Sequence, residues 1–192
     1  MTSTYMYEKN DFSRIIGTPG FSEALLADHF TLYEGYVKNV NVLLEKLATI
    51  GADSLEGAEL RRRLGWEWNG MRLHELYFGN IAKDSVPIHD GPLKERLVRG
   101  YESLESWERD FRATGAMRGV GWAILSEDKE NGTLLNTWVN EHDGGHLAGA
   151  TPLLVMDVFE HAYIRDYGIR RTDYIGAFMQ AIDWNAVESR LG

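Results

Sequence analysis

The sequence predicts an α+β protein, with a helical hairpin in its first half and a small three-stranded antiparallel sheet flanked by helices in its second half. Three observations support this prediction. Apolar residues recur at helical spacing over residues 22–82, the period changes to that of strands over residues 121–158, and helical spacing returns from about residue 160. Helices followed by a block of strands in one chain indicate the α+β class.

The first expected helix spans about residues 22–48. Ser22 is a suitable N-cap, and Glu23 stands in the first turn, where a negative charge is favourable. Apolar side chains then recur at intervals of three and four residues. His29 lies on this same apolar stripe, so it is expected to face the core.

A second helical region is expected over about residues 55–82, with a break near Gly65. Its later part, WNGMRLHELYFGNIA, places His74 among apolar and aromatic residues. The segment SVPIHDGP, next in the chain, has the breaker residues of a linker. We therefore expect a boundary there, between an N-terminal helical domain of residues 1–88 and a C-terminal α/β domain of residues 89–192.

The C-terminal half is expected to begin with two helices, one over about residues 92–101 and one after the N-cap Ser103. Two strands come next, GWAILSED and TLLNTWVNEHD, and the turn Asn131-Gly132 between them is a strong hairpin signal. TPLLVMDV is the third expected strand. From about Glu160 the pattern is helical to the end.

Composition and charge narrow the classes of function. The chain has 192 residues, 44% of them apolar, as is typical of a globular protein. Its net charge of −9 disfavours binding to nucleic acid, because the phosphates would repel it. No membrane span and no signal peptide is visible, and the lack of cysteine excludes thiolate metal sites and fits a reducing compartment. We expect a cytoplasmic protein that binds neither nucleic acid nor membrane.

The stretch LLVMDVFEHAY places Asp157 four residues before His161, in the most apolar part of the second half. Burying an unpaired charge is costly, so such groups are normally paired, hydrogen-bonded or bound to a metal. One buried histidine is more often a core residue than a ligand. Three of them, His29, His74 and His161, together with one carboxylate, favour iron, manganese or zinc. A metal would also supply the positive charge that offsets the burial of Asp157.

Several segments resemble the iron/manganese superoxide dismutase family. GVGWAILS is similar to its glycine-x-glycine-tryptophan strand, and LLVMDVFEHAY to its aspartate-x-tryptophan-glutamate-histidine-alanine-tyrosine signature, with Phe159 in place of tryptophan. RRTDYIGAFMQAIDW resembles the closing helix. SEALLADHF…YVKNVN and WNGMRLHELYF resemble the two ligand helices, so the resemblance covers about residues 20–191.

The resemblance implies a superoxide dismutase with one iron or manganese ion per chain. The metal ligands that it implies are His29, His74, Asp157 and His161. Tyr36 matches a tyrosine at the substrate entrance, and Trp122 matches an aromatic wall of the site. Glu160 matches a glutamate that crosses a dimer interface. The resemblance therefore implies a homodimer in which Glu160 bridges to the partner's His161.

The first helix departs from the family pattern. His29 and Tyr36 are one residue closer together than the family's pair, and Asp28 is the rival first ligand if the segments are aligned without a gap. Removing one residue from a helix rotates the residues after it by about 100°, although it could also regularise a local bulge. The family's gateway histidine has no match here, and Ile164 replaces its partner tyrosine.

A second departure concerns the side chain that hydrogen-bonds metal-bound solvent, normally a glutamine. Manganese-type members have glycine at the position of Gly70 and glutamine at the position of His142. This chain has Gly70 and His142, so it has the manganese-type placement with a different residue. A histidine there can donate or accept according to its tautomer, and it would tune the redox potential. The choice between iron, manganese and both is left open.

Two other classes of function remain open on the sequence. One is a zinc-dependent hydrolase, although four protein ligands leave little room for a catalytic tetrahedral zinc site. The other is a non-enzymatic or degenerate metal-binding protein of the same fold, which the missing gateway pair suggests. His89 and His146 are interpreted as solvated loop residues.

Overall fold

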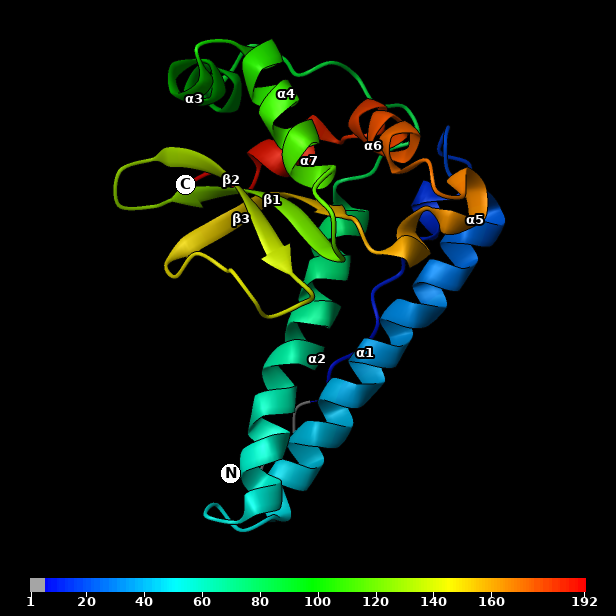
Figure 1. Cartoon of the computed structure of the whole chain (residues 1–192), viewed down its shortest axis with the longest axis vertical. Helices are drawn as coiled ribbons and strands as arrows, with labels where there is room; N and C mark the ends of the chain where they lie inside the picture. The colour runs from blue at the N-terminus through cyan, green and yellow to red at the C-terminus, as the bar shows by residue number, and fades with distance from the viewer. Residues whose placement is uncertain (1–5) are drawn as a thin grey trace.

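A computed structural model describes residues 6–192, and its elements have the expected order of helices, sheet and helices (Figure 1). Residues 1–5 of the expected N-terminal domain lie outside the described residues. The helices are α1 (Glu23–Thr49), α2 (Leu55–Gly79), α3 (Pro92–Tyr101), α4 (Leu104–Gly115), α5 (Ile164–Tyr167), α6 (Arg171–Gln180) and α7 (Trp184–Glu188), with 3-10 turns η1 (Ser13–Ile15) and η2 (Glu160–Ala162). The strands are β1 (Gly121–Asp128), β2 (Thr133–Asn140) and β3 (Ala150–Asp157).

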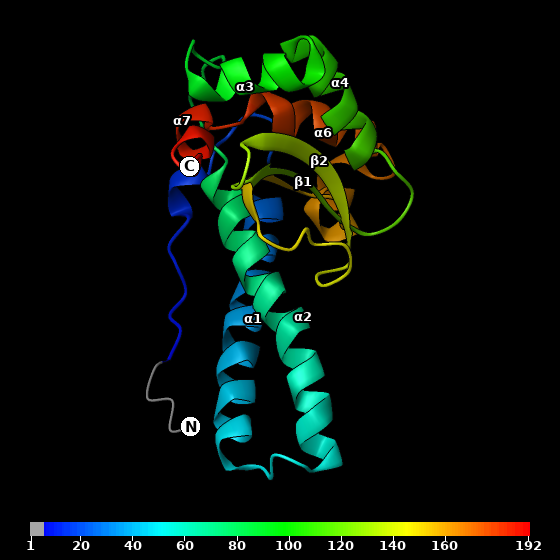
Figure 2. The same cartoon turned by 90° about the vertical axis from the view of Figure 1, so that its left-hand side faces the viewer.

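Helices α1 and α2 form a long hairpin whose tip projects away from the rest of the molecule (Figures 1 and 2). Each begins at a serine N-cap, since Ser22 accepts from the backbone N–H of Leu25 and Ser54 from that of Gly57. The expected break near Gly65 is wrong, because α2 runs through it without interruption. A glycine keeps its backbone N–H, so it costs a helix only about 1 kcal/mol relative to alanine.

The sheet has the order β2-β1-β3, and both pairs are antiparallel. β1 and β2 form the expected hairpin, and β1 is buried along almost its whole length. In the other pair, Trp122 stands opposite Asp157, at the last position of β3. Figures 1 and 2 show that α3 and α4 lie at the end of the molecule opposite the hairpin tip.

The segment after β3 is not one continuous helix. It consists of η2, α5, α6 and α7, and α5 ends at Gly168, whose φ of 57° lies in the left-handed region. The periodicity predicted helical residues but not these interruptions. A glycine ends a helix when its backbone takes the left-handed conformation, and the spacing of apolar residues does not reveal that conformation. Within residues 6–192 no helix is both long and apolar enough to cross a membrane.

The C-terminal end of α2 is tied to β3 by Asn80, which is buried, and Arg190, which is partly buried. The amide of Asn80 donates to the carbonyl of Val155 at 2.6 Å, and the guanidinium of Arg190 donates to the Asn80 side chain and to the carbonyl of Leu153. Asn80 is fully buried. These bonds hold a strand and a helix, which are far apart in sequence, in one relative position.

One hydrophobic core runs through the described residues, from Ile15 and Leu25 to Ile182 and Val187. The segment after α2 is part of it, because Ile81 forms a β-bridge with Ile182. The division into domains at residue 88 stays a prediction.

Gly121 and Gly65 offer a matched test of this fold. Gly121 has φ +149°, and an added Cβ would lie 2.0 Å from the carbonyl oxygen of Val139. We therefore expect Gly121→Ala to lower the free energy of unfolding by at least about 1 kcal/mol. Nothing lies within 4 Å of a Cβ at Gly65, so Gly65→Ala should raise it by about 0.5–1 kcal/mol. Urea unfolding measures the free energy of unfolding of both variants. If Gly121→Ala and Gly65→Ala were equally stable, the described backbone at these positions would be contradicted.

Candidate metal centre

Four side chains from four separate elements converge where α1, α2 and the end of β3 meet. His29 comes from α1, His74 from α2, Asp157 from β3 and His161 from η2, and one donor atom of each lies within 4.8 Å of the others. The Asp157 Oδ2 atom is 3.2 Å from His29 Nε2, 3.6 Å from His74 Nε2 and 3.1 Å from His161 Nε2. The first three are buried, and the side chain of His161 is 26% exposed.

The hydrogen bonds behind these side chains aim the donor atoms at one another. His74 Nδ1 lies 2.6 Å from the carbonyl oxygen of Gly70, so Nδ1 carries the hydrogen and donates it, and Nε2 presents a lone pair. Asp157 Oδ1 accepts from the backbone N–H of Phe159 at 2.8 Å, which leaves Oδ2 to face the histidines. The Tyr174 hydroxyl donates to the backbone carbonyl of Asp157 at 2.6 Å and holds the end of the strand.

The residues present fit a metal ion. Among the described residues, His74 Nε2 is the buried side-chain polar atom without a hydrogen-bond partner, and such an atom requires an explanation. Ligands that each lie about 2.1 Å from one ion stand about 3–3.5 Å apart, which matches the 3.1–3.6 Å between Asp157 and the histidines. Three nitrogens and one oxygen, without sulfur, suit iron, manganese or zinc.

The electrostatics of the cluster favour a cation at its centre. Burial lowers the pKa of His29 and lowers that of His74 well below its usual value, so both imidazoles are neutral near pH 7. Burial alone would raise the pKa of Asp157, but the charge and hydrogen bond of His161 and the hydrogen bond of His29 outweigh it and lower that pKa. The cluster is therefore a carboxylate beside two neutral imidazoles, and its single negative charge would be offset by a bound cation.

Tyr36, His142 and Trp122 form a hydrogen-bonded chain beside the cluster. The Tyr36 hydroxyl lies 2.7 Å from His142 Nε2, and Trp122 Nε1–H donates to His142 Nδ1 at 3.1 Å. The Tyr36 ring stacks on His74 with centroids 5.1 Å apart. Gly70 makes room for this ring, because a Cβ there would lie 2.5 Å from Tyr36 Cδ1. All three of the expected second-sphere residues thus lie next to the four expected ligands.

The short spacing between His29 and Tyr36 is compatible with this geometry because α1 is an uninterrupted helix. Seven residues are nearly two helical turns, so both side chains lie on one face. The rival Asp28 is exposed and pairs with Arg165, outside the cluster. Glu160 is also exposed and lies outside it.

Sequence reasoning missed several neighbours of the site. Trp66 packs edge-on against His142 with ring centroids 4.4 Å apart, and Phe159 stacks on the same imidazole with centroids 4.8 Å apart. His146, interpreted as a solvated loop residue, is exposed but lies with Nε2 2.8 Å from the carbonyl oxygen of His142. Trp66 is eight residues before His74 on α2, and this helical spacing was the signal available for it.

Comparisons with known proteins agree with this arrangement. The family model described as iron/manganese superoxide dismutases, C-terminal domain, matches residues 89–190. The chain is 37% identical over 179 residues to a superoxide dismutase (Fe) of Cupriavidus metallidurans, covering 89% of this chain and 88% of the relative. It is 34% identical to superoxide dismutase (Mn) 2 of Haloferax volcanii, covering 90% and 87%.

A third relative extends over more of the chain. The superoxide dismutase (Fe) of Aquifex pyrophilus is 32% identical, in an alignment that covers 95% of this chain and 90% of the relative. These similarities span the helical hairpin as well as the sheet, and therefore all four elements that carry the cluster. Together with the matched domain they establish that the chain belongs to the iron/manganese superoxide dismutase family.

Proposed function

We propose that this protein is a superoxide dismutase, which converts two superoxide anions and two protons to dioxygen and hydrogen peroxide. The single observation that carries the proposal is the buried lone pair of His74 Nε2, which has no partner and faces a carboxylate among neutral imidazoles. His29, His74, Asp157 and His161 would hold one iron or manganese ion. When bound, that ion supplies one-electron oxidation and reduction, which the side chains present do not provide.

The protein's own residues prepare the centre for this chemistry. Asp157 brings one negative charge, and the bonds from Phe159 and Tyr174 hold it in place, so little reorganisation is needed. The Tyr36 hydroxyl keeps its proton, because burial, followed by the charge of Asp157, raises its pKa. Tyr36 is half-buried beside His74, where a protonated hydroxyl can contact a small anion. Tyr36, His142 and Trp122 are accordingly the side chains proposed to act around the ion.

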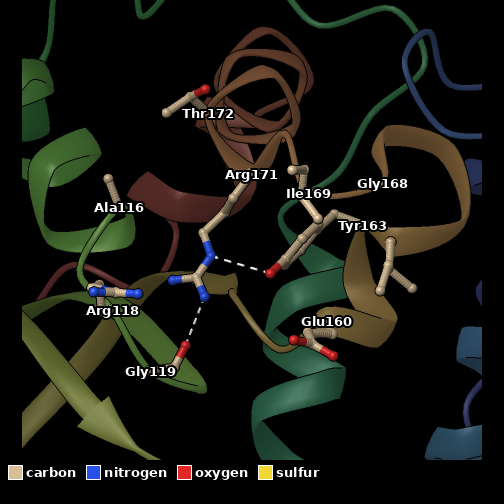
Figure 3. A pocket seen from close by; sticks show the side chains of 10 residues that line it. Ala116, Arg118, Gly119, Glu160, Tyr163, Gly168, Ile169, Arg171 and Thr172 are labelled. Atoms are coloured by element: carbon tan, nitrogen blue, oxygen red, sulfur yellow. Dashed lines mark hydrogen bonds between the residues drawn. The ribbon is translucent and has the colours of Figure 1, made fainter.

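We also propose that the protein forms a homodimer in which Glu160 reaches the partner's His161. Glu160 is exposed directly before a ligand whose own side chain is partly exposed, so a second chain has access to both. It lines a surface hollow of about 340 Å³ together with Tyr163 and Ile164 (Figure 3). Ile169 in the same hollow is 94% exposed, which supports a covered surface in the assembly.

We further propose a cytoplasmic location, which cell fractionation would test.

Figure 3 also shows Arg171 and Tyr163 side by side in the lining of this hollow. The Arg171 guanidinium donates to the backbone carbonyls of Met117 and Gly119, and its Nε–H to the Tyr163 hydroxyl. Arg171 therefore ties the start of α6 to the loop before β1. This supports a preformed rather than an adaptable surface around Glu160.

Metal reconstitution tests the activity. The protein loaded with iron or with manganese should disproportionate superoxide with at least one of them, and the zinc-loaded protein should not, because zinc has no accessible redox change. His74→Ala should weaken metal retention by at least about 10–100-fold, the loss seen when even an outer partner is removed. His89→Ala, at a half-exposed histidine that pairs with Glu188, is the control and should retain metal.

The outcomes separate the candidate functions. Full occupancy by iron and by manganese without dismutation would overturn the proposal in favour of a degenerate metal-binding protein. Hydrolytic activity that persists with zinc would favour the hydrolase instead. Metal content is measured by elemental analysis and activity by the decay of superoxide absorbance.

The pH dependence of the metal-free protein tests the buried histidines. Because the folded state lowers the pKa of His29 and His74 below the unfolded value near 6.5, the unfolded chain binds more protons below that pH. Their contribution is fully present above about pH 6.5 and is lost as the pH falls. The free energy of unfolding should fall by up to about 1.4 kcal/mol per pH unit for each histidine. Urea midpoints at pH 8, 7, 6 and 5 measure this, and a flat profile would contradict neutral buried imidazoles.

The proposed bridge predicts that Glu160→Ala weakens both assembly and metal retention. Loss of the carboxylate would remove the partner that orients the His161 ring, so metal affinity should fall about 10–100-fold. Glu45→Ala is the matched control, because Glu45 is an exposed glutamate on the hairpin. Sedimentation equilibrium gives the mass and elemental analysis the metal content. A Glu160→Ala protein with the parent's mass and metal content would show that the bridge is absent.

A further inference from the structure

We infer that Trp122 locks His142 into the tautomer with its hydrogen on Nε2, so that His142 donates to Tyr36 and has no hydrogen left for the metal centre. The inference rests on the proposed function and deepens it. His142 is then a positioning residue that acts through Tyr36, and the Tyr36 hydroxyl is the member of the pair that can donate to a substrate.

The direction of the first hydrogen bond is set by the chemistry of the indole. Trp122 Nε1–H is a donor only, and it lies 3.1 Å from His142 Nδ1. His142 Nδ1 must therefore accept, and it carries no hydrogen. Trp122 is fully buried, so no water replaces this bond if the acceptor is lost.

His142 has one hydrogen to place. Its side chain is fully buried, and because Nδ1 accepts from Trp122 it carries no hydrogen, so the ring is the neutral imidazole and not the doubly protonated form. A neutral imidazole carries a single N–H, which must stand on Nε2. Nε2 lies 2.7 Å from the Tyr36 hydroxyl, so His142 donates and the phenol oxygen accepts. In the opposite tautomer, the N–H of His142 Nδ1 would point at the N–H of Trp122 Nε1, and two donors would face each other without an acceptor.

The surroundings of His142 keep its ring in this orientation. Phe159 stacks on one side with centroids 4.8 Å apart, and Trp66 packs edge-on at 4.4 Å. A ring turned over by 180° would present carbon atoms to both Trp122 and Tyr36 and lose both hydrogen bonds. The backbone is held too, because His146 Nε2–H donates to the His142 carbonyl at 2.8 Å.

The consequence for Tyr36 comes from counting hydrogens. Its oxygen already accepts from His142, so its own O–H hydrogen points elsewhere and is free for another acceptor. A glutamine amide at position 142 would offer two N–H hydrogens, one for Tyr36 and one to spare. A histidine locked by Trp122 offers one and has already used it. Of this pair, the Tyr36 hydroxyl is therefore the group that has a hydrogen to donate.

The tautomer can be measured directly by nitrogen NMR. The full-length protein, labelled with ¹⁵N histidine and tryptophan and loaded with diamagnetic zinc, is studied at pH 7 by long-range ¹H–¹⁵N correlation. We expect the hydrogen of His142 on Nε2, and a coupling between Nδ1 of His142 and Nε1 of Trp122 across their hydrogen bond. The metal-free protein gives the same readout, and the His142→Gln spectrum assigns the signals by their loss.

Two variants separate the cause of the lock from its consequence. Tyr36→Phe removes the acceptor but not the donor that sets the tautomer, so the Nε2–H form and the Trp122 coupling should persist. Trp122→Phe removes that donor, so the coupling should be lost and an Nδ1–H form should appear. The coupling in the parent protein decides the matter even if Trp122→Phe does not fold. A hydrogen on Nδ1 in the parent, or on both nitrogens, would overturn the inference.

The tautomer measurements test the inference separately from the proposed activity. They need no superoxide turnover, so an inactive protein with the Nε2–H tautomer would contradict dismutation and leave the lock intact. An active protein with the Nδ1–H tautomer would do the reverse.

Discussion

The structure depends on one carboxylate that is completely buried. Asp157 has no exposed surface, and the atoms that face its Oδ2 are imidazole nitrogens of His29, His74 and His161. A charge so placed is stable only with partners that offset the loss of water. The fold must therefore place the three histidines, from α1, α2 and η2, within 3.1–3.6 Å of Asp157 Oδ2 at the end of the strand. The hairpin, the sheet and the turn after it are arranged around this requirement.

The bonds that hold those elements together lie one layer behind the cluster. Asn80 and Arg190 fix the end of α2 to β3, and Tyr174 holds the carbonyl of Asp157. On the other side, Arg165 pairs with Asp28, which ties α5 to the helix that carries His29. Each connection joins segments far apart in the chain, so the cluster is held by tertiary contacts rather than by any single element.

The departures from the family pattern change the surroundings of the site rather than the site itself. The regular helix of α1 compensates for the shorter spacing between His29 and Tyr36. His142 takes the place of an amide and keeps bonds to both Tyr36 and Trp122, but with one hydrogen fewer to give. Ile164, which is exposed, replaces a tyrosine at the surface where a second subunit is proposed to bind. The chain therefore differs from the family pattern at positions around the four-residue cluster, which we propose act in proton supply and in contact with a second subunit.

The sequence by itself determined the class of fold, the order of the elements and the burial of His29 and His74, because periodicity and caps act over a few neighbouring residues. It also indicated Asp157 and His161, since an acidic residue at the end of an apolar strand is costly without a partner. Only the tertiary structure decided that α2 continues through Gly65, that Asp28 lies outside the cluster and that Trp66 and His146 contact His142. The positions of Asp28 and Trp66 depend on packing between segments separated by many residues. The contact between His146 and His142, four residues apart, depends on a loop conformation that no local pattern encodes. The direction of the Trp122–His142 bond belongs to the same group, because it is set by which two side chains meet.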